Sequence, residues 1–312
     1  MPRMVRFMSF VAAVALCLSG LNAGAAGLSS AHFRIVSGNG RDYYPRVALD
    51  SAERVLPRIT DALGVPLVSP ITITLAADDR EFRTLTRGVL PDWSSAAALD
   101  KSTIVVSPLD GHKMSLERIL AHEIVHCVLM SVAKDVPLPR WFHEGCAEYL
   151  SGGFGLGDRL YMVWNVSRGR ILSFSTIEDV FSVGSADAGL AYDQSLLAVS
   201  YLNRLEGGHV LAGILAAVGE GMPFGDAFES VTGMSIGRFE MAFRDYLSRN
   251  YGKKALIVYV PGTWTIILIL AFIAWGIKRI RTRRLLRQWD EEERRGTIVR
   301  FPPVPPDDPF DD

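Results

Sequence analysis

The chain has 312 residues, 49% of them hydrophobic and 21% charged, so its length and apolar content exclude disorder as a general description. Its 33 Lys and Arg residues nearly balance 34 Asp and Glu residues, which gives no support for a whole-chain nucleic-acid binder. Three cysteines are too few for a disulfide scaffold, whereas the mean hydropathy of +0.19 is high for a water-soluble protein and comes largely from two apolar segments.

The first apolar segment, within residues 1–26, has the three-part pattern of a secretory signal peptide. Two arginines precede an uncharged apolar run, and Ala23–Ala25 offers a small-residue cleavage site. The alternative is an uncleaved N-terminal anchor. A signal at this position predicts that the following residues, 27–252, are exported to the periplasm or the cell exterior.

Strands and helices alternate in the next part of the chain. Period-two alternation predicts strands over residues 32–36 and 71–75, and residues 102–107 (STIVVS) are expected to form another strand. Helical spacing of apolar residues predicts a helix over 44–63. A short helix is expected over 79–86, with a loop rich in Gly, Pro and Ser between it and the last strand.

An H-E-x-x-H motif lies in a predicted helix that begins at Leu116 and that Ser115 can cap. Residues four apart on a helix share a face, so the imidazoles of His122 and His126 can bind one metal ion. Glu123 projects beside that face, where it can act on a metal-bound water as a general base. The helix is too short and polar to cross a bilayer, which excludes an intramembrane protease.

A catalytic zinc ion needs a third protein ligand and an open position for water. Residues 138–150 read LPRWFHEGCAEYL, in which Glu144 follows the second motif histidine by eighteen positions, enough for a second helix to return. His143 is the alternative ligand, and neighbours on a helix point about 100° apart, so only one of the two is expected to bind. The E-G context favours Glu144, and Glu148 lies one turn further, placed to hydrogen-bond a ligand histidine.

These motifs resemble the gluzincin metallopeptidases, in which the ligand glutamate lies in an E-G-x-A-x-Y-like stretch on the helix after H-E-x-x-H. The sequence is more closely similar to the bacterial peptidase MA-like family, and the similarity extends over most of residues 27–252. It implies a zincin-like α+β fold and a Zn²⁺-dependent peptidase. It also implies that His122, His126 and Glu144 are the zinc ligands and that Glu123 is the catalytic base.

The resemblance extends to a tyrosine and to the kind of substrate. Tyr192, in AYDQS, resembles the tyrosine that stabilises the oxyanion in related aminopeptidases, the alternative being a structural core residue. The G-x-M-E-N stretch that binds the free amine in the aminopeptidase branch is missing, which favours an endopeptidase acting on peptides or proteins. The alternative is a non-catalytic, protease-like module that binds a peptide or partner protein, although the intact Glu123 argues against it. The strand at 103–106 is a candidate for binding an extended peptide by strand addition.

Cys127 and Cys146 lie beside the expected zinc residues, on the two helices that must meet. In an oxidising compartment they can form a disulfide, and the alternative is two buried thiols.

After the glycine-rich stretch that follows Leu150, the spacing predicts mostly helices up to Tyr251. The exported domain is therefore expected to be α+β: a small mixed sheet and the zinc-site helices over 27–155, then a helical half over 156–252.

The second apolar segment, residues 255–277, carries no charge and has about the 20 residues that a membrane-spanning helix needs. A buried core helix is the alternative. Because the heavier cluster of Lys and Arg follows the segment, the positive-inside rule places the tail, 278–312, in the cytoplasm. The sequence thus predicts a single-pass protein of the bacterial inner or plasma membrane with its catalytic domain outside the cytoplasm. The tail is first basic, then acidic and rich in proline.

Overall fold

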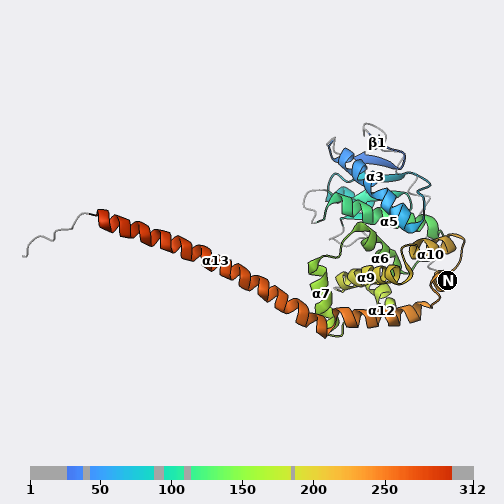
Figure 1. Cartoon of the computed structure of the whole chain (residues 1–312). Coiled ribbons are helices and arrows are strands. Elements are labelled where there is room, and N and C mark those ends of the chain that lie inside the picture. The colour runs from blue at the N-terminus through green and yellow to red at the C-terminus, as the bar shows by residue number, and fades with distance from the viewer. Residues whose placement is uncertain (1–26, 38–42, 88–94, 109–113, 184–186, 297–312) are drawn as a thin grey trace, which may run out of the picture. The chain divides into compact units, whose positions relative to one another are not determined.

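A computed structural model of the chain (Figure 1) describes residues 27–37, 43–87, 95–108, 114–183 and 187–296. The expected signal peptide at 1–26 and the proline-rich end of the tail lie outside these residues. The chain divides into two compact units, one ending at Lys253 and one starting at Lys254.

The first half of the larger unit forms a sheet with helices packed against it. Its elements are β1 (Leu28–Ser29), β2 (Phe33–Ser37), α3 (Tyr43–Leu63), β3 (Ile71–Leu75), α4 (Asp79–Leu85), β4 (Ala96–Asp100), β5 (Thr103–Val106) and α5 (Leu116–Ala133).

The sheet has the strand order β1-β2-β3-β5-β4, in which the three inner strands are parallel and the two outer strands are antiparallel to their neighbours. Apolar side chains of the inner strands, such as Phe33, Ile73 and Ile104, are completely buried. Helices α3 and α5 pack on each other and on the sheet, which holds the H-E-x-x-H helix in place.

Two strands were not expected, the two-residue β1 and the longer β4. Residues 96–100 form β4 where the sequence predicts a loop, so that prediction is wrong. Their sequence, AAALD, contains residues of low strand propensity, and only pairing with β5 and packing against α5 makes them a strand.

The position of β4 also corrects the expectation that the strand at 103–106 binds peptide by strand addition. β5 is hydrogen-bonded to β3 on one side and to β4 on the other, so it has no free edge. The edge of the sheet on this side is β4.

The second half of the larger unit is helical. Its elements are α6 (Arg140–Ser151), α7 (Leu156–Ser167), α8 (Phe174–Val183), α9 (Ala188–Glu206), α10 (Val210–Gly219), α11 (Phe224–Thr232) and α12 (Ile236–Tyr251). Trp141 of α6 is buried among Phe174, Phe224, Phe228 and Phe239, which join α8, α11 and α12 to α6 around one aromatic core. The predicted α+β architecture, with a small mixed sheet followed by a helical subdomain, is confirmed.

The smaller unit contains α13 (Lys253–Arg295). Within the residues that the structure describes, no helix is both long enough and apolar enough to cross a membrane, so the span expected at 255–277 is not supported. Residues 256–263 of that span lie outside the residues whose side chains are described.

Candidate metal centre

The motif helix α5 begins where the sequence predicts. The Ser115 hydroxyl oxygen accepts a hydrogen bond from the backbone N–H of Arg118 at 3.3 Å, which caps the helix. The apolar side chains expected to pack, including Ile124 and Val128, are buried. Their burial leaves His122 and His126 on the side of α5 that lines a cavity.

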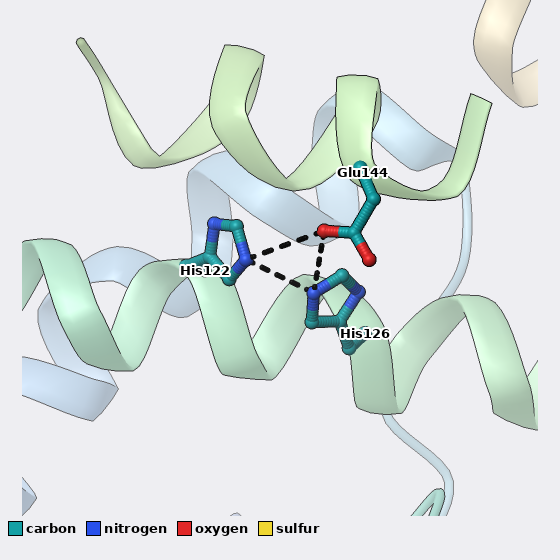
Figure 2. A group of neighbouring side chains, drawn as sticks. All are labelled: His122, His126 and Glu144. Atoms are coloured by element: carbon teal, nitrogen blue, oxygen red, sulfur yellow. Dashed lines mark hydrogen bonds and ion pairs between the residues drawn. The ribbon is translucent and has the colours of Figure 1, made fainter. Parts of the chain in front are cut away.

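The two motif histidines meet Glu144 of α6, as Figure 2 shows. The Nε2 atoms of His122 and His126 lie 3.0 Å apart. Glu144 Oε2 lies 3.7 Å from the first of these atoms and 3.5 Å from the second. Ligands about 2.05 Å from a tetrahedral zinc ion are separated by about 3.3 Å, so the three atoms already stand near the corners of such a site.

The chemistry of these groups also fits a metal ion. Glu144 Oε2 is buried and has no hydrogen-bond partner, although a carboxylate in that position needs one. Burial lowers the pKa of His122 and of His126 to about 4, so both imidazoles are neutral and keep the lone pair that a metal ligand must offer. Two neutral imidazoles and a carboxylate form the donor set of many catalytic zinc sites.

His143, the alternative ligand, lies against His126. Its ring stacks on that of His126, with centroids 4.6 Å apart and an angle of 8° between the planes. Among the described residues, the group that can hold a metal comprises His122, His126 and Glu144. His143 therefore contacts a candidate ligand and is not part of the group.

Glu123 lines the same cavity and is held by a strand that the sequence did not predict. Its Oε2 accepts a hydrogen bond of 2.6 Å from the backbone N–H of Ala98 in β4. Burial raises the pKa of the Glu123 carboxyl to about 8, and the nearby Glu144 and Glu148 add to this effect. A carboxyl with a raised pKa, fixed beside a metal site, is suited to accepting a proton.

Glu148 connects the metal group to an arginine. Its Oε1 lies 3.5 Å from His122 Nδ1, and its Oε2 accepts a hydrogen bond of 3.2 Å from Arg118 Nη2. The same guanidinium donates a hydrogen bond of 3.5 Å to the backbone carbonyl oxygen of Gly153. A Cβ added at Gly153 would overlap the Arg118 guanidinium. Sequence reasoning did not identify Arg118, although it lies four residues before His122, on the same face of α5.

The cavity has a volume of about 1000 Å³ and receives side chains from distant parts of the chain. Tyr192 of α9 lines it and packs its ring against Phe181 at a centroid distance of 4.7 Å. Burial raises the pKa of the Tyr192 phenol above its usual value, so the hydroxyl keeps its proton and can donate it in a hydrogen bond. The neighbouring Asp193 also lines the cavity, and burial raises the pKa of its carboxyl to about 7.

Cys127 and Cys146 are both buried free thiols, so of the two alternatives the disulfide is wrong. The Cys127 thiol donates a hydrogen bond to the carbonyl oxygen of Asp100, at the end of β4, over 3.2 Å.

Two solved structures each align with 72% of this chain. One is an M1 zinc metallopeptidase from Deinococcus radiodurans, with 16% sequence identity, a TM-score of 0.40 and 50% of its own length aligned. The other is a variant of that enzyme bound to a Tyr-Ser-Ala substrate, with 15% sequence identity, a TM-score of 0.41 and 51% of its own length aligned. The chain thus spans about half the length of the solved structures that it matches. No curated protein sequence matches it. The sequence profile of the Peptidase MA superfamily matches residues 51–249, well over half of the chain, and the chain therefore belongs to that superfamily.

Proposed function

We propose that this protein is a zinc-dependent peptidase that hydrolyses peptide bonds in peptides or proteins. The observation that carries the proposal is the convergence of His122, His126 and Glu144 on one point of a cavity that Glu123 also lines. Membership of the Peptidase MA superfamily supports the same reaction class.

The chain's own residues can perform the proton transfers of peptide hydrolysis. A zinc ion on the three ligands would act as a Lewis acid that polarises the scissile carbonyl and activates water. Glu123 takes the proton of the attacking water on Oε1, because Ala98 N–H already occupies Oε2, and passes it to the leaving amine. The Tyr192 hydroxyl donates a hydrogen bond to the oxyanion that develops on the carbonyl.

Endopeptidase action and a membrane anchor are further parts of the proposal. The missing G-x-M-E-N stretch supports the first, since nothing in the sequence marks a site for a free amine. The uncharged segment 255–277 and the basic residues after it support an anchor that leaves the peptidase domain outside the cytoplasm.

The substitution Glu123→Gln tests the peptidase proposal. The amide keeps the size of the side chain and cannot take a proton, so peptide cleavage should fall about 100- to 10,000-fold while zinc content stays at one ion per chain. Peptide cleavage and metal content should be measured on the same samples of wild type and variant.

Two outcomes would contradict the proposal: a wild-type protein without metal, or cleavage that survives the substitution. A wild type that binds peptides with no cleavage would favour the non-catalytic binding module instead. Glu144→Ala is the companion variant, and it should lose zinc altogether because it removes one of three ligands.

A further inference from the structure

The outward face of α7 carries large apolar side chains. Leu156, Leu160, Tyr161 and Trp164 are exposed by 66%, 38%, 39% and 52%. Three of them recur every four residues and form a stripe about 12 Å long on one side of the helix. We call these four residues the α7 stripe. Contiguous exposed apolar side chains of this size on a folded protein mark an interaction surface.

The charges beside the α7 stripe are positive. The Arg168 guanidinium lies 3.9 Å from the ring centroid of Trp164, and Arg159, also exposed, projects from the same helix. The carboxylate of Asp158 is engaged elsewhere, since it accepts a hydrogen bond of 2.8 Å from Gly155 N–H and lines the cavity. The surface therefore combines leucine, aromatic and arginine side chains.

The α7 stripe belongs to the part of the larger unit where its last helix ends. α7 packs against α12, and the ring of Phe154, just before α7, lies 6.1 Å from that of Tyr251, the last residue of α12. Four residues after Tyr251 the uncharged segment 255–277 begins. A chain anchored by that segment would bring the end of α12, and α7 with it, close to the bilayer surface.

We propose that the α7 stripe rests in the interfacial layer of the bilayer to which the chain is anchored, with Arg159 and Arg168 facing anionic headgroups. Leucine and tryptophan on one face of a helix, bordered by arginine, form the pattern of helices that lie in this layer. Tryptophan and tyrosine favour it because their rings are apolar at one end and polar at the other.

This inference rests on the proposed anchor and peptidase activity and specifies a class of substrate. Asp158 and Tyr161 of α7 also line the cavity that holds the metal group. A docked α7 keeps that cavity beside the headgroups, so the substrates are peptide segments next to the membrane, in membrane proteins or in lipid-tethered proteins.

A fluorescent probe at position 160 tests the docking without relying on catalysis. The full-length Leu160→Cys protein, labelled with an environment-sensitive dye, is reconstituted into phosphatidylcholine vesicles with and without phosphatidylglycerol. Val68→Cys is the matched control, because Val68 is an apolar residue that is 87% exposed on the loop between α3 and β3. The native Cys127 and Cys146 are buried, and the unsubstituted chain gives the background labelling of all native cysteines, Cys17 included.

Lipid-attached nitroxide should quench the probe at 160 several times more strongly than the probe at 68, and phosphatidylglycerol should increase the difference. Three outcomes overturn the docking. The protein does not float with the vesicles, the two probes are equally accessible to a water-soluble quencher, or the probe at 160 is shielded from water but not quenched by the lipid nitroxide. The last result would mean that protein, such as a second copy of the chain, covers the stripe.

The substrate class has its own test. In a variant with Leu156→Ser, Leu160→Ser and Trp164→Ser, cleavage of a lipid-tethered peptide on vesicles should fall several-fold, while cleavage of the same peptide free in solution is unchanged. Equal loss on both peptides, or loss on neither, overturns the substrate class. A protein whose probe at 160 is quenched but which cleaves neither peptide would contradict the proposed function and leave the docking standing.

Discussion

At the scale of single residues, the metal group depends on contacts that orient its ligands. His122 Nδ1 faces Glu148, and Arg118 holds the other oxygen of that carboxylate while also reaching Gly153. A carboxylate behind a ligand histidine fixes the orientation of the ring and the nitrogen that is left for the metal. Arg118 is thus a positioning residue, which would act on a metal ion at this site through Glu148 and His122.

Removing Arg118 should therefore weaken metal binding. Glu148→Ala should lower zinc affinity about 10- to 100-fold, and Arg118→Ala should lower it by about tenfold at most, because the carboxylate remains but is free to rotate. Arg118→Lys should restore part of the loss, since it keeps the charge but cannot bridge two acceptors. Competition with a chelator measures each affinity.

Arg54→Ala is the control for these variants. Arg54 pairs with Glu117 at 2.6 Å on the exposed surface of α3 and α5, where an ion pair contributes little. Its zinc affinity should equal that of the wild type. An Arg118→Ala protein with unchanged zinc affinity would show that the arginine only supports the fold.

Asp193 should make the stability of the protein depend on pH. Burial, with Asp158 and Glu148 nearby and Arg118 opposing them, raises the pKa of its carboxyl from 3.8 to about 7 in the folded state. Between these values the folded chain holds a proton that the unfolded chain has lost. The contribution of Asp193 to the free energy of unfolding therefore falls as the pH rises from about 4 to about 7, and stays low above that.

Asp193→Asn removes the loss of stability that ionisation of Asp193 causes, because the amide does not ionise. The variant should melt at a higher temperature than the wild type at pH 8, with a much smaller difference at pH 4. Asp61→Asn, at an exposed position of α3, is the control for removing one negative charge. A difference in melting temperature that is equal at both pH values would contradict the assignment.

At the scale of elements, the packing of α6 against α9 sets the position of Glu144. Of all the described pairs of elements, these two helices share the most extensive contact. Gly145 allows this close approach: a Cβ there would overlap the carbonyl oxygen of Ser195 and lie 2.7 Å from Val199 Cγ2. Because Gly145 directly follows Glu144, the candidate ligand, any shift of α6 displaces the group His122, His126 and Glu144.

Gly145→Ala should consequently destabilise the protein by about 1–3 kcal/mol, the usual cost of an added methyl group in a packed interface. Gly157→Ala is the matched control, since this helical glycine of α7 has no atom within 4 Å of an added Cβ. That variant should be about 0.5–1 kcal/mol more stable than the wild type. Urea unfolding measures the free energy of unfolding of both variants. Equal changes in the two variants would contradict the close packing of α6 against α9 at Gly145.

At the scale of the whole molecule, the near-zero net charge is the sum of unlike parts. Basic residues gather at 278–287 and acidic residues at the end of the tail, and the candidate catalytic residues all lie outside these two groups of charges. The placement of these charges therefore bears on topology, and their sum says little about partners.

The proposed topology predicts where a C-terminal reporter will be found. A reporter fused after Asp312 should be active as a cytoplasmic protein, and deletion of residues 255–277 should move the chain from the membrane fraction to the soluble fraction. A full-length chain recovered in the soluble fraction would contradict the anchor, and an exported reporter would contradict the orientation.

Local pattern was sufficient for the motif helix and for the choice of candidate ligands. The N-cap at Ser115 and the shared face of His122 and His126 follow from local helical pattern, which is a property of neighbouring residues, and Glu144 was chosen from its E-G context. Local sequence also predicted the three inner strands: side chains alternate in β2 and β3, and β5 is a short run of apolar residues.

Only the tertiary structure decided which residues that are distant in sequence come into contact. β4 is a strand because β5 and α5 lie beside it, and it supplies the N–H that holds Glu123. The side chains of Arg118 and Tyr192 line the cavity of the metal group because α5, α6 and α9 pack closely, and that packing depends on burial and shape, which the spacing of residues along the chain does not encode.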